Sequence, residues 1–381
     1  MRISKYIDQL NQKNIPIYLK ERISLAKLIV LHNDISFMPR RSVPYYLNDL
    51  GVREFKSIQK MMLTVCHDNC IKIPTTHELV EELACIPIQK YAYWIDMVIF
   101  LTGDYQAVEI SVLNRFDEIV AYADYTLCIF SGTVLVARNN KKGLQLFELA
   151  SNINVSKSTL NRLTALHRMA VSELKRFRNF KKVESILNEI VLENHSNIQD
   201  DLMMTVLVNN LYAFFLLESH REMWGSLYIE LIMKNAQLLS KALLYSKDIS
   251  DNKKHQVARY LSQININLAQ IFLKKEQLKR AIYLLELNVD MVSKYATVYI
   301  SEALGTLGYF YFLNKDFKRA IPILEQALVY HVNEGEFYSI VFDYQLLIVL
   351  YYKTDNMMKV RELEKELVKL EQSDSKRGIY D

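Results

Sequence analysis

The stretch GYFYFLNKDFKRAIPILEQALVYH, residues 308–331, decides the fold. It places a small residue, Gly308, beside a row of aromatic residues, breaks at Asn-Lys-Asp, and then sets Ala320 and Ala327 seven residues apart. Small residues at such positions let two antiparallel helices approach closely, while large residues fill the space between them. The stretch therefore predicts a helical hairpin with its closest contacts at Gly308 and Ala320.

The spacing of small and large residues in this hairpin reproduces that of a tetratricopeptide repeat. The same pattern recurs at intervals of 36, 40, 40, 58, 39 and 40 residues, at Ala107, Gly143, Val183, Met223, Ala281, Ala320 and Val360. The 58-residue interval must hold extra helix and the loop SKDISDNKKH. We predict an all-α fold, a degenerate tetratricopeptide-repeat superhelix, which is a right-handed α-solenoid.

Composition supports a helical globular protein. The 381 residues are 50% hydrophobic and 24% charged, with only nine Gly and six Pro to break helices. The longest apolar runs stop short of the roughly 20 residues needed to cross a bilayer, so no membrane partner and a cytoplasmic location are expected. The four cysteines fit reduced thiols in a helical core better than a disulfide framework.

A solenoid of this kind presents a long concave groove lined by the first helix of each pair, and its expected ligand is an extended peptide. Repeat geometry places these residues in the groove: Gln263, Ile266, Gln270 and Leu273, then Glu302, Gly305, Tyr309 and Phe312, then Phe342, Gln345, Val349 and Tyr352. Amides and a guanidinium satisfy a peptide backbone and its terminal carboxylate, and an acidic residue pairs with a basic side chain. The alternative is that these residues are solvated groove wall.

The N-terminal segment has a different character. Residues 1–60 carry eleven Lys/Arg against five Asp/Glu, a charge of +6 in a chain whose total is +4. The helical pattern of 21–33 and 39–51 resembles the two-helix layout of a DNA reader, and we predict a helix-turn-helix-like domain at 1–56. Its DNA contacts would be Arg40, Arg41, Ser42 and Tyr45 in the major groove and Lys20, Arg22 and Arg53 on phosphates. The alternative is a helical cap on the solenoid.

The sequence gives no sign of an enzyme. His77–Glu81 comes near the zinc-protease HExxH pattern but ends in Glu, so the second helix-spaced imidazole is missing. There is no phosphate-binding Gly loop and no nucleophile elbow. Cys66 and Cys70 lack a second ligand pair. We therefore predict no catalytic residues, no metal and no cofactor.

A basic head followed by a degenerate repeat array resembles the arbitrium receptors of Bacillus phages (AimR-like proteins), peptide-sensing tetratricopeptide-repeat regulators of the RRNPP type. The likeness spans about residues 60–270. It is carried by SVPYYLNDLGVREFKSIQKMM (42–62), by the repeats in 141–190 and by VLVNNLYAF (206–214). The resemblance implies a homodimeric, DNA-binding transcription regulator in the bacterial host cytoplasm. It would control lysis and lysogeny, and a secreted hexapeptide in the groove would alter its binding to a double-stranded operator.

The resemblance also implies site residues. The Asn and Arg that hold the peptide in that family map onto Asn210 and Arg259, with Asn209, Asn267 and Glu302 as weaker neighbours, and Tyr309 joins them from its groove position. Family dimers join through the C-terminal region. Here the closing helix of the 57–381 repeat domain carries the apolar stripe Met357, Val360, Leu363, Leu367 and Leu370. That stripe equally fits a cap on the solenoid.

Two other classes stay open. Rap regulators of the same bacteria are peptide-gated repeat proteins of similar length whose helical head binds a response regulator instead of DNA. A plain assembly scaffold would bind no short peptide. The basic head with Arg40 and Arg41 favours the DNA-binding class.

Overall fold

A computed structural model describes residues 2–11, 23, 27, 62–153, 159–197, 202–219, 226–247, 249, 251–334 and 337–375. All of the elements in these ranges are helices, and no strand occurs in them. The chain divides into two compact units, Met1–Asn197 (the first unit) and Ile198–Asp381 (the second unit). The predicted all-α solenoid of tetratricopeptide-like helix pairs is confirmed.

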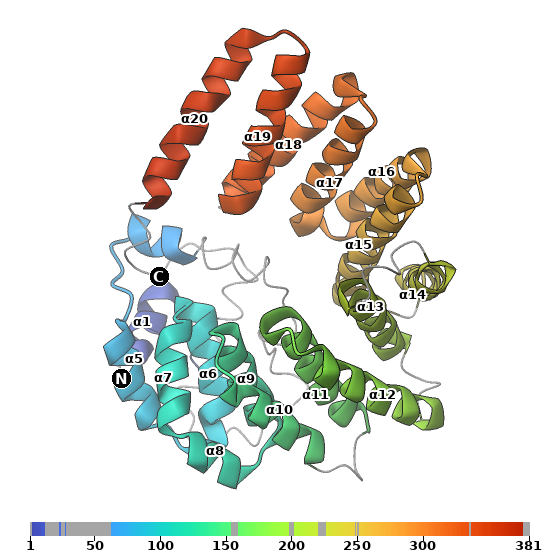
Figure 1. Cartoon of the computed structure of the whole chain (residues 1–381). Helices are drawn as coiled ribbons and strands as arrows, with labels where there is room; N and C mark the ends of the chain where they lie inside the picture. The colour runs from blue at the N-terminus through green and yellow to red at the C-terminus, as the bar shows by residue number, and fades with distance from the viewer. Residues whose placement is uncertain are drawn as a thin grey trace. The chain divides into compact units, whose positions relative to one another are not determined.

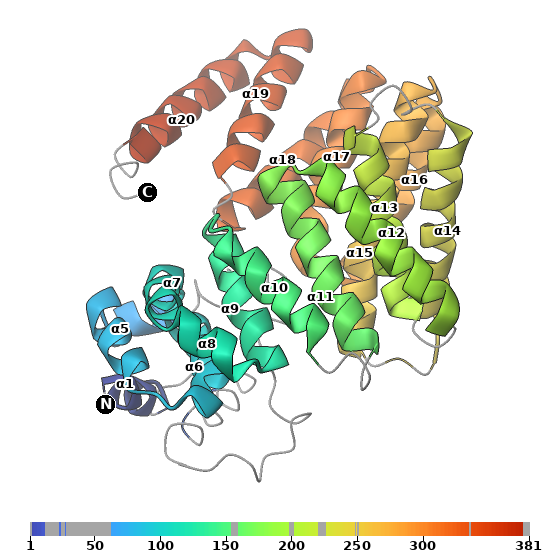
Figure 2. The same ribbon diagram turned by 60° about the horizontal axis from the view of Figure 1, so that its bottom comes forward.

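The first unit packs helices from both ends of its sequence. Its elements are α1 (Arg2–Asn11), α5 (Thr76–Ala84), α6 (Ile88–Thr102), α7 (Tyr105–Asn114), α8 (Phe116–Tyr122), α9 (Tyr125–Ala137), α10 (Lys142–Asn152), α11 (Thr159–Ser172), the π-helical turn Glu173–Phe177, and α12 (Phe180–Asn197). Successive helices from α9 to α12 lie side by side, as Figure 2 shows. Asp104 and Asp124 start α7 and α9 because their carboxylates accept hydrogen bonds from the backbone N–H groups of Ala107 and Leu127.

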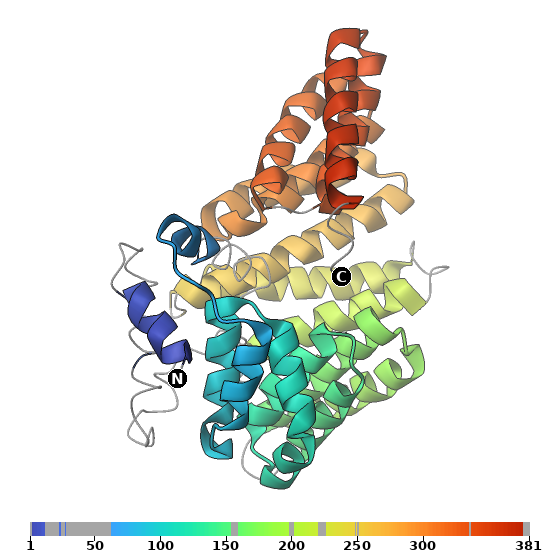
Figure 3. The same cartoon turned by 90° about the vertical axis from the view of Figure 1, so that its left-hand side faces the viewer.

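The second unit is a row of helix pairs. It comprises α13 (Leu202–Ser219) with α14 (Leu227–Leu244), α15 (Asp251–Lys274) with α16 (Leu278–Tyr295), the 3₁₀ turn Thr297–Tyr299, α17 (Ile300–Leu313) with α18 (Phe317–Glu334), and α19 (Phe337–Lys353) with α20 (Met357–Ser375). Each helix packs against the next one along the chain (Figures 1 and 3). The extra helix expected in the 58-residue interval is the long α15, which takes in the end of the predicted SKDISDNKKH loop.

One turn geometry joins first and second helices in four of the pairs. In each of these turns a backbone N–H donates to the carbonyl five residues earlier in the chain. The residue just before that N–H has a left-handed backbone conformation, although it is not a glycine. These left-handed residues are Asn139 (φ 59°), Glu276 (φ 60°), Lys315 (φ 58°) and Asp355 (φ 61°). The bonds are Asn140 to Leu135, Gln277 to Phe272, Asp316 to Tyr311, and Asn356 to Tyr351, at 2.8 to 3.0 Å. The recurrence shows that these turns are equivalent parts of a repeat.

Glycines allow the closest helix crossings. A Cβ on Gly308 of α17 would lie 2.5 Å from Leu324 Cγ on α18, so only glycine fits this contact. In the first unit, a Cβ on Gly143 of α10 would lie 2.6 Å from the carbonyl oxygen of Gly132 on α9. Ala320 and Ala327 are fully buried. Gly308 is therefore a point of close approach between the two helices, and Ala320 and Ala327 lie in the core of the hairpin.

The described part of the predicted N-terminal domain is built into the first unit. Ile3, Tyr6, Ile7 and Leu10 of α1 are at most 2% exposed, and α1 packs against α5. The Tyr6 hydroxyl donates to the carbonyl of Leu101 in α6 at 3.0 Å and lies 3.3 Å from the Cys66 thiol. Apart from α1, Ile23 and Lys27, the predicted helix-turn-helix domain at 1–56 lies outside the described residues.

Candidate functional site

The candidate site is the face formed by the first helices of the second unit, which we call the first-helix face. Along it α13 contacts α15, α15 contacts α17, and α17 contacts α19. The positions predicted to line it become more exposed toward the last pair. Ile266 of α15 and Gly305 of α17 are buried, whereas Phe342 and Tyr352 of α19 are 46% and 67% exposed.

Two asparagines predicted to bind the peptide lie on α13. Asn209 and Asn210 are half-buried on a helix that is otherwise largely apolar. The side-chain oxygen Oδ1 of Asn210 is buried and has no hydrogen-bond partner. Leaving a buried acceptor unpaired costs on the order of 1–3 kcal/mol, so a hydrogen-bond donor that reached this oxygen would stabilise the protein.

Asn267 of α15 supplies the complementary group. Its side chain is 5% exposed, its Oδ1 accepts a long hydrogen bond of 3.4 Å from Gln263 Nε2, and its Nδ2 is buried without a partner. Arg259, Gln263 and Asn267 are spaced four residues apart and therefore follow one side of α15. An unpaired acceptor on α13 and an unpaired donor on α15 thus occupy two helices in contact with each other.

Arg259 is held by aromatic rings. Its guanidinium carbon lies 5.2 Å from the ring centre of Tyr299 and 5.7 Å from that of Tyr260. Among the described residues Arg259 forms no ion pair with an acidic side chain. These cation–π contacts orient the guanidinium, and its N–H groups can donate two parallel hydrogen bonds to a carboxylate.

The predicted residues of α17 play different parts. Glu302 is half-buried in the first turn of the helix. Tyr309 belongs to an aromatic cluster, with its ring centre 5.9 Å from that of Phe342 on α19 and 6.5 Å from that of Phe312. This cluster joins α17 to α19 and gives the first-helix face an apolar surface.

A chain of buried polar side chains connects α15 to both of its neighbouring second helices. Gln237 of α14 donates to Asn265 at 2.6 Å, Asn265 donates to Asn288 of α16 at 3.0 Å, and Asn288 donates to Ser262 at 3.0 Å. The sequence analysis missed these residues because their partners are 23 to 28 positions apart. Helical periodicity predicts contacts only between residues three or four positions apart, so it does not predict contacts between separate helices.

A second buried polar pair lies next to Gly305. His331 of α18 and Asp343 of α19 are 4% and 1% exposed, and their side chains meet at 2.6 Å. A Cβ built on Gly305 would lie 3.4 Å from the His331 ring. Asp343 is therefore committed to His331 beneath the first-helix face.

Glu230 is the most heavily paired carboxylate described in the second unit. It is 5% exposed on α14 and pairs with Lys234 at 2.6 Å, with Lys275 at 2.5 Å, and more loosely with Arg280 at 4.0 Å. Burial acts to raise the pKa of Glu230, but the hydrogen bonds from Lys234 and Lys275 outweigh it and hold the pKa below its usual range. This cluster ties α14 to the turn between α15 and α16.

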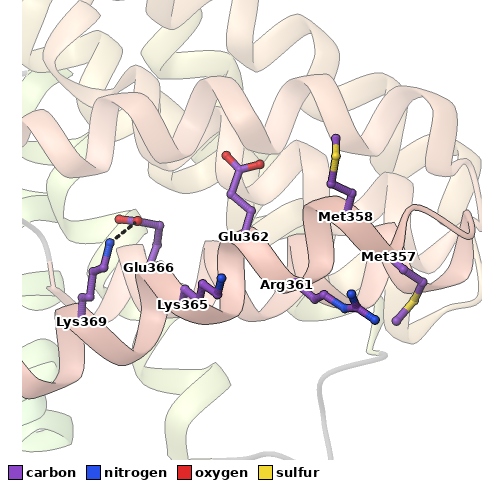
Figure 4. Close-up of a pocket in the computed structure, with 7 residues that line it drawn as sticks. All are labelled: Met357, Met358, Arg361, Glu362, Lys365, Glu366 and Lys369. Carbon is purple, nitrogen blue, oxygen red and sulfur yellow. Dashed lines mark hydrogen bonds and ion pairs between the residues drawn. The ribbon is translucent and has the colours of Figure 1, made fainter.

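The predicted dimerisation stripe follows one side of α20. Val360 is 4% exposed and Met357 is 41% exposed, while Leu363, Leu367 and Leu370 are half-buried. Val360 thus contributes to packing within the pair. A neighbouring surface pocket of about 490 Å³, drawn in Figure 4, is lined by Met357, Met358, Arg361, Glu362, Lys365, Glu366 and Lys369.

The predicted DNA contacts, Lys20, Arg22, Arg40, Arg41, Ser42, Tyr45 and Arg53, all lie outside the described residues. Within the described ranges no group of three or more His, Cys, Asp or Glu side chains is arranged to hold a metal ion. The described part of the chain also contains no helix with both the length and the hydropathy to span a bilayer. All four cysteines are free.

Comparison with known proteins extends the fold assignment only. No protein-family profile matches the sequence, and no curated protein is significantly similar to it. A structure of BtubC (BKLC) from P. vanneervenii is similar over 63% of this chain and 92% of its own, with a TM-score of 0.52 and 15% identity. A STAND signal transduction ATPase with a tetratricopeptide repeat sensor, from Pyrococcus horikoshii, is similar over 97% of this chain, with a TM-score of 0.54 and 15% identity. The chain spans 56% of that protein's length.

Proposed function

We propose that this protein is a non-enzymatic receptor for a short extended peptide and that the peptide binds the first-helix face of the second unit. In the full proposal the protein is a dimeric, DNA-binding transcription regulator in a bacterial cytoplasm. Binding of a secreted peptide of about six residues changes its affinity for an operator that controls phage lysis and lysogeny. The basic N-terminal segment is the proposed DNA-binding part.

The observation that carries the proposal is the pair of unpaired amide atoms. Asn210 presents a buried acceptor and Asn267 a buried donor, on two first helices that touch. A peptide backbone offers an N–H and a C=O in each unit and pairs with both. Arg259, stacked on Tyr299, is placed on the same helix as Asn267 to bind the C-terminal carboxylate.

The aromatic cluster supports the same ligand class. Tyr309, Phe312 and Phe342 give the face an apolar region for peptide side chains, and Glu302 supplies an acidic group for a basic one. Aromatic anchors beside a few fixed polar groups are typical of specific recognition sites.

The proposed mechanism is a shift between two curvatures of the solenoid. A peptide that binds one curvature better than the other changes the spacing at which two subunits present their DNA-binding segments. A tenfold loss of operator affinity needs only about 1.4 kcal/mol of differential binding. A small ligand is therefore sufficient.

Isothermal calorimetry with a synthetic peptide encoded immediately downstream of the gene tests the receptor proposal. Asn210→Ala and Asn267→Ala should each weaken binding by about tenfold, because each removes a hydrogen bond to the backbone of the ligand. Asn152→Ala, at an exposed position of α10, is the matched control and should bind normally. Equal affinities in all four proteins would contradict the site.

A gel-shift experiment with the DNA upstream of the gene tests whether the protein binds DNA and whether the peptide changes this binding. The protein should retard this DNA at low salt, and the peptide should reverse or alter the shift. If the peptide binds in the calorimeter but the protein retards no DNA, the proposal of a peptide receptor stands and the proposal of a DNA-binding regulator is contradicted.

One observation favours a second candidate, a Rap-like receptor that acts on another protein. α1 packs into the first unit through Tyr6 and its neighbours, as expected of a helical bundle that forms a protein-binding head. Pull-down of a purified response regulator, with and without peptide, distinguishes this candidate from the DNA-binding one.

A further inference from the structure

The exposed side of α14 carries an unusual pattern for a surface helix. Tyr228, Leu231, Leu238 and Tyr245 are 51%, 54%, 65% and 63% exposed, and Asn235 and Ala242 between them are exposed as well. These six residues, which we call the α14 seam, are spaced three and four residues apart without interruption. Alternating steps of three and four are the a and d positions of a heptad, the pattern by which one helix packs along another.

The seam is held in place at both ends. The hydroxyl of Tyr228 lies 3.4 Å from that of Tyr212 on α13. The ring of Tyr245 meets that of Tyr295 at the end of α16, edge to face, at 6.3 Å. In Figure 2, α14 can be followed along its length beside α13. Because both terminal rings already make contacts within the second unit, they lose less side-chain freedom on binding than rings without such contacts.

The charges beside the seam identify the partner. Lys234 and Lys241 occupy the same heptad position, next to the seam and one heptad apart. The acidic residue of α14, Glu230, is buried and pairs with Lys234, Lys275 and Arg280, so this cluster keeps a net positive charge, and Lys241 has no ion-pair partner among the described residues. The edge of the seam is therefore basic, and a partner helix with acidic residues at its flanking positions complements it.

A second copy of α14 fits less well. In an antiparallel pair of identical seams, the lysines at this position would face the lysines of the other copy, and like charges at flanking positions disfavour pairing. Asn235 at a central a position also favours a partner with its own polar residue there, since a buried polar a position selects one register.

We propose that the α14 seam is a docking site for an amphipathic helix of another protein, with apolar residues at heptad a and d positions and acidic residues beside them. This surface belongs to a second helix and is separate from the first-helix face. One protein thus has one face for a peptide and another for a protein partner. The inference does not depend on the identity of the peptide or on DNA binding.

The test uses the full chain and a defined probe. The probe is a labelled helical peptide about three heptads long with Leu at a and d and Glu at the flanking positions, kept below its self-association concentration. Its counterpart has Lys in place of Glu. Fluorescence anisotropy should show binding of the Glu peptide to wild type and at least about tenfold weaker binding to Leu231→Glu/Leu238→Glu.

Two variants control the result. Val329→Glu/Val332→Glu changes two exposed valines on α18 and should bind like wild type. Lys241→Glu should reduce the preference for the Glu peptide over the Lys peptide, and an unchanged preference would contradict an acidic partner. Circular dichroism checks that each variant is folded, which is expected because Glu is a good helix former at an exposed position.

Three further outcomes would overturn the proposal. The first is no binding of the Glu peptide to wild type, and the second is equal binding to the seam variant. The third comes from sedimentation. If wild type is a dimer and Leu231→Glu/Leu238→Glu is a monomer, a second copy of the chain occupies the seam.

Discussion

At the scale of single residues, Gly308 shows how one missing methyl group sets the distance between two helices. Gly308→Ala would push a Cβ to within 2.5 Å of Leu324 Cγ, and relieving that overlap should cost about 1–3 kcal/mol of unfolding free energy. Gly305→Ala on the same helix is the matched control, because its Cβ would meet nothing closer than 3.4 Å. Urea denaturation of both variants checks the prediction, and equal stabilities would contradict it.

Glu230 should give the second unit a specific acid sensitivity. Its pKa is lowered in the folded state, so its ion pairs stabilise the protein above the ordinary carboxyl pKa, and this stability is lost as pH falls through the folded value. Glu230→Gln should lower the unfolding free energy by about 1–3 kcal/mol at neutral pH, and the difference from wild type should shrink below about pH 4. Denaturation curves across this pH range measure it. Glu364→Gln, at an exposed position of α20, is the matched control and should leave the unfolding free energy at neutral pH unchanged.

At the scale of elements, the turns between paired helices carry a small strain that glycine would remove. Lys315 adopts a left-handed conformation at φ 58° between α17 and α18. Lys315→Gly should stabilise the protein by about 0.5–1 kcal/mol, since glycine reaches this conformation without steric cost. Lys318→Gly, at the second residue of α18, should destabilise the protein instead, because glycine is a poor helix former. A drop in thermal midpoint for Lys315→Gly would refute the assignment of strain.

The sequence predicted the α17–α18 hairpin well, because the residues that determine it are close together in the chain. Gly308, Ala320 and the Asn-Lys-Asp break lie within one hairpin, so their spacing reports their contacts directly. The Gln237–Asn265–Asn288 chain joins three helices, and the Glu230 cluster joins α14 to Lys275 in the turn after α15 and to Arg280 of α16, so no local sequence pattern predicts either one. Asn210 and Asn267 were predicted from a resemblance, but their unpaired atoms became visible only with the neighbouring helices in place.

At the scale of the whole molecule, the N-terminal segment carries two different signals, one in its charges and one in the packing of its first helix. The charge pattern predicts a separate domain at 1–56, whereas α1 is part of the core of the unit Met1–Asn197. The charge of a segment indicates which ligands its surface attracts. The apolar face of α1 instead determines where the helix packs, and it consists of Ile3, Tyr6, Ile7 and Leu10. The two signals come from different residues and need not agree on a boundary.

Packing of α1 makes a prediction about the intact chain. Tyr6→Ala should destabilise the first unit by about 3–5 kcal/mol, because it leaves a cavity and removes the hydrogen bond to Leu101. Tyr338→Ala, at a side chain that is 87% exposed, should change stability little. Calorimetric unfolding compares the two. A Tyr6→Ala protein as stable as wild type would indicate that α1 is dispensable to the unit.

The row of helix pairs in the second unit also has a mechanical consequence. Each pair contacts mainly the pair before and the pair after it. Such a row is flexible as a whole, because small changes in tilt between successive helix pairs add up to a large displacement of the last pair relative to the first. A ligand that restricts the tilt between two neighbouring pairs would therefore change the position of distant pairs without breaking any single contact between helices.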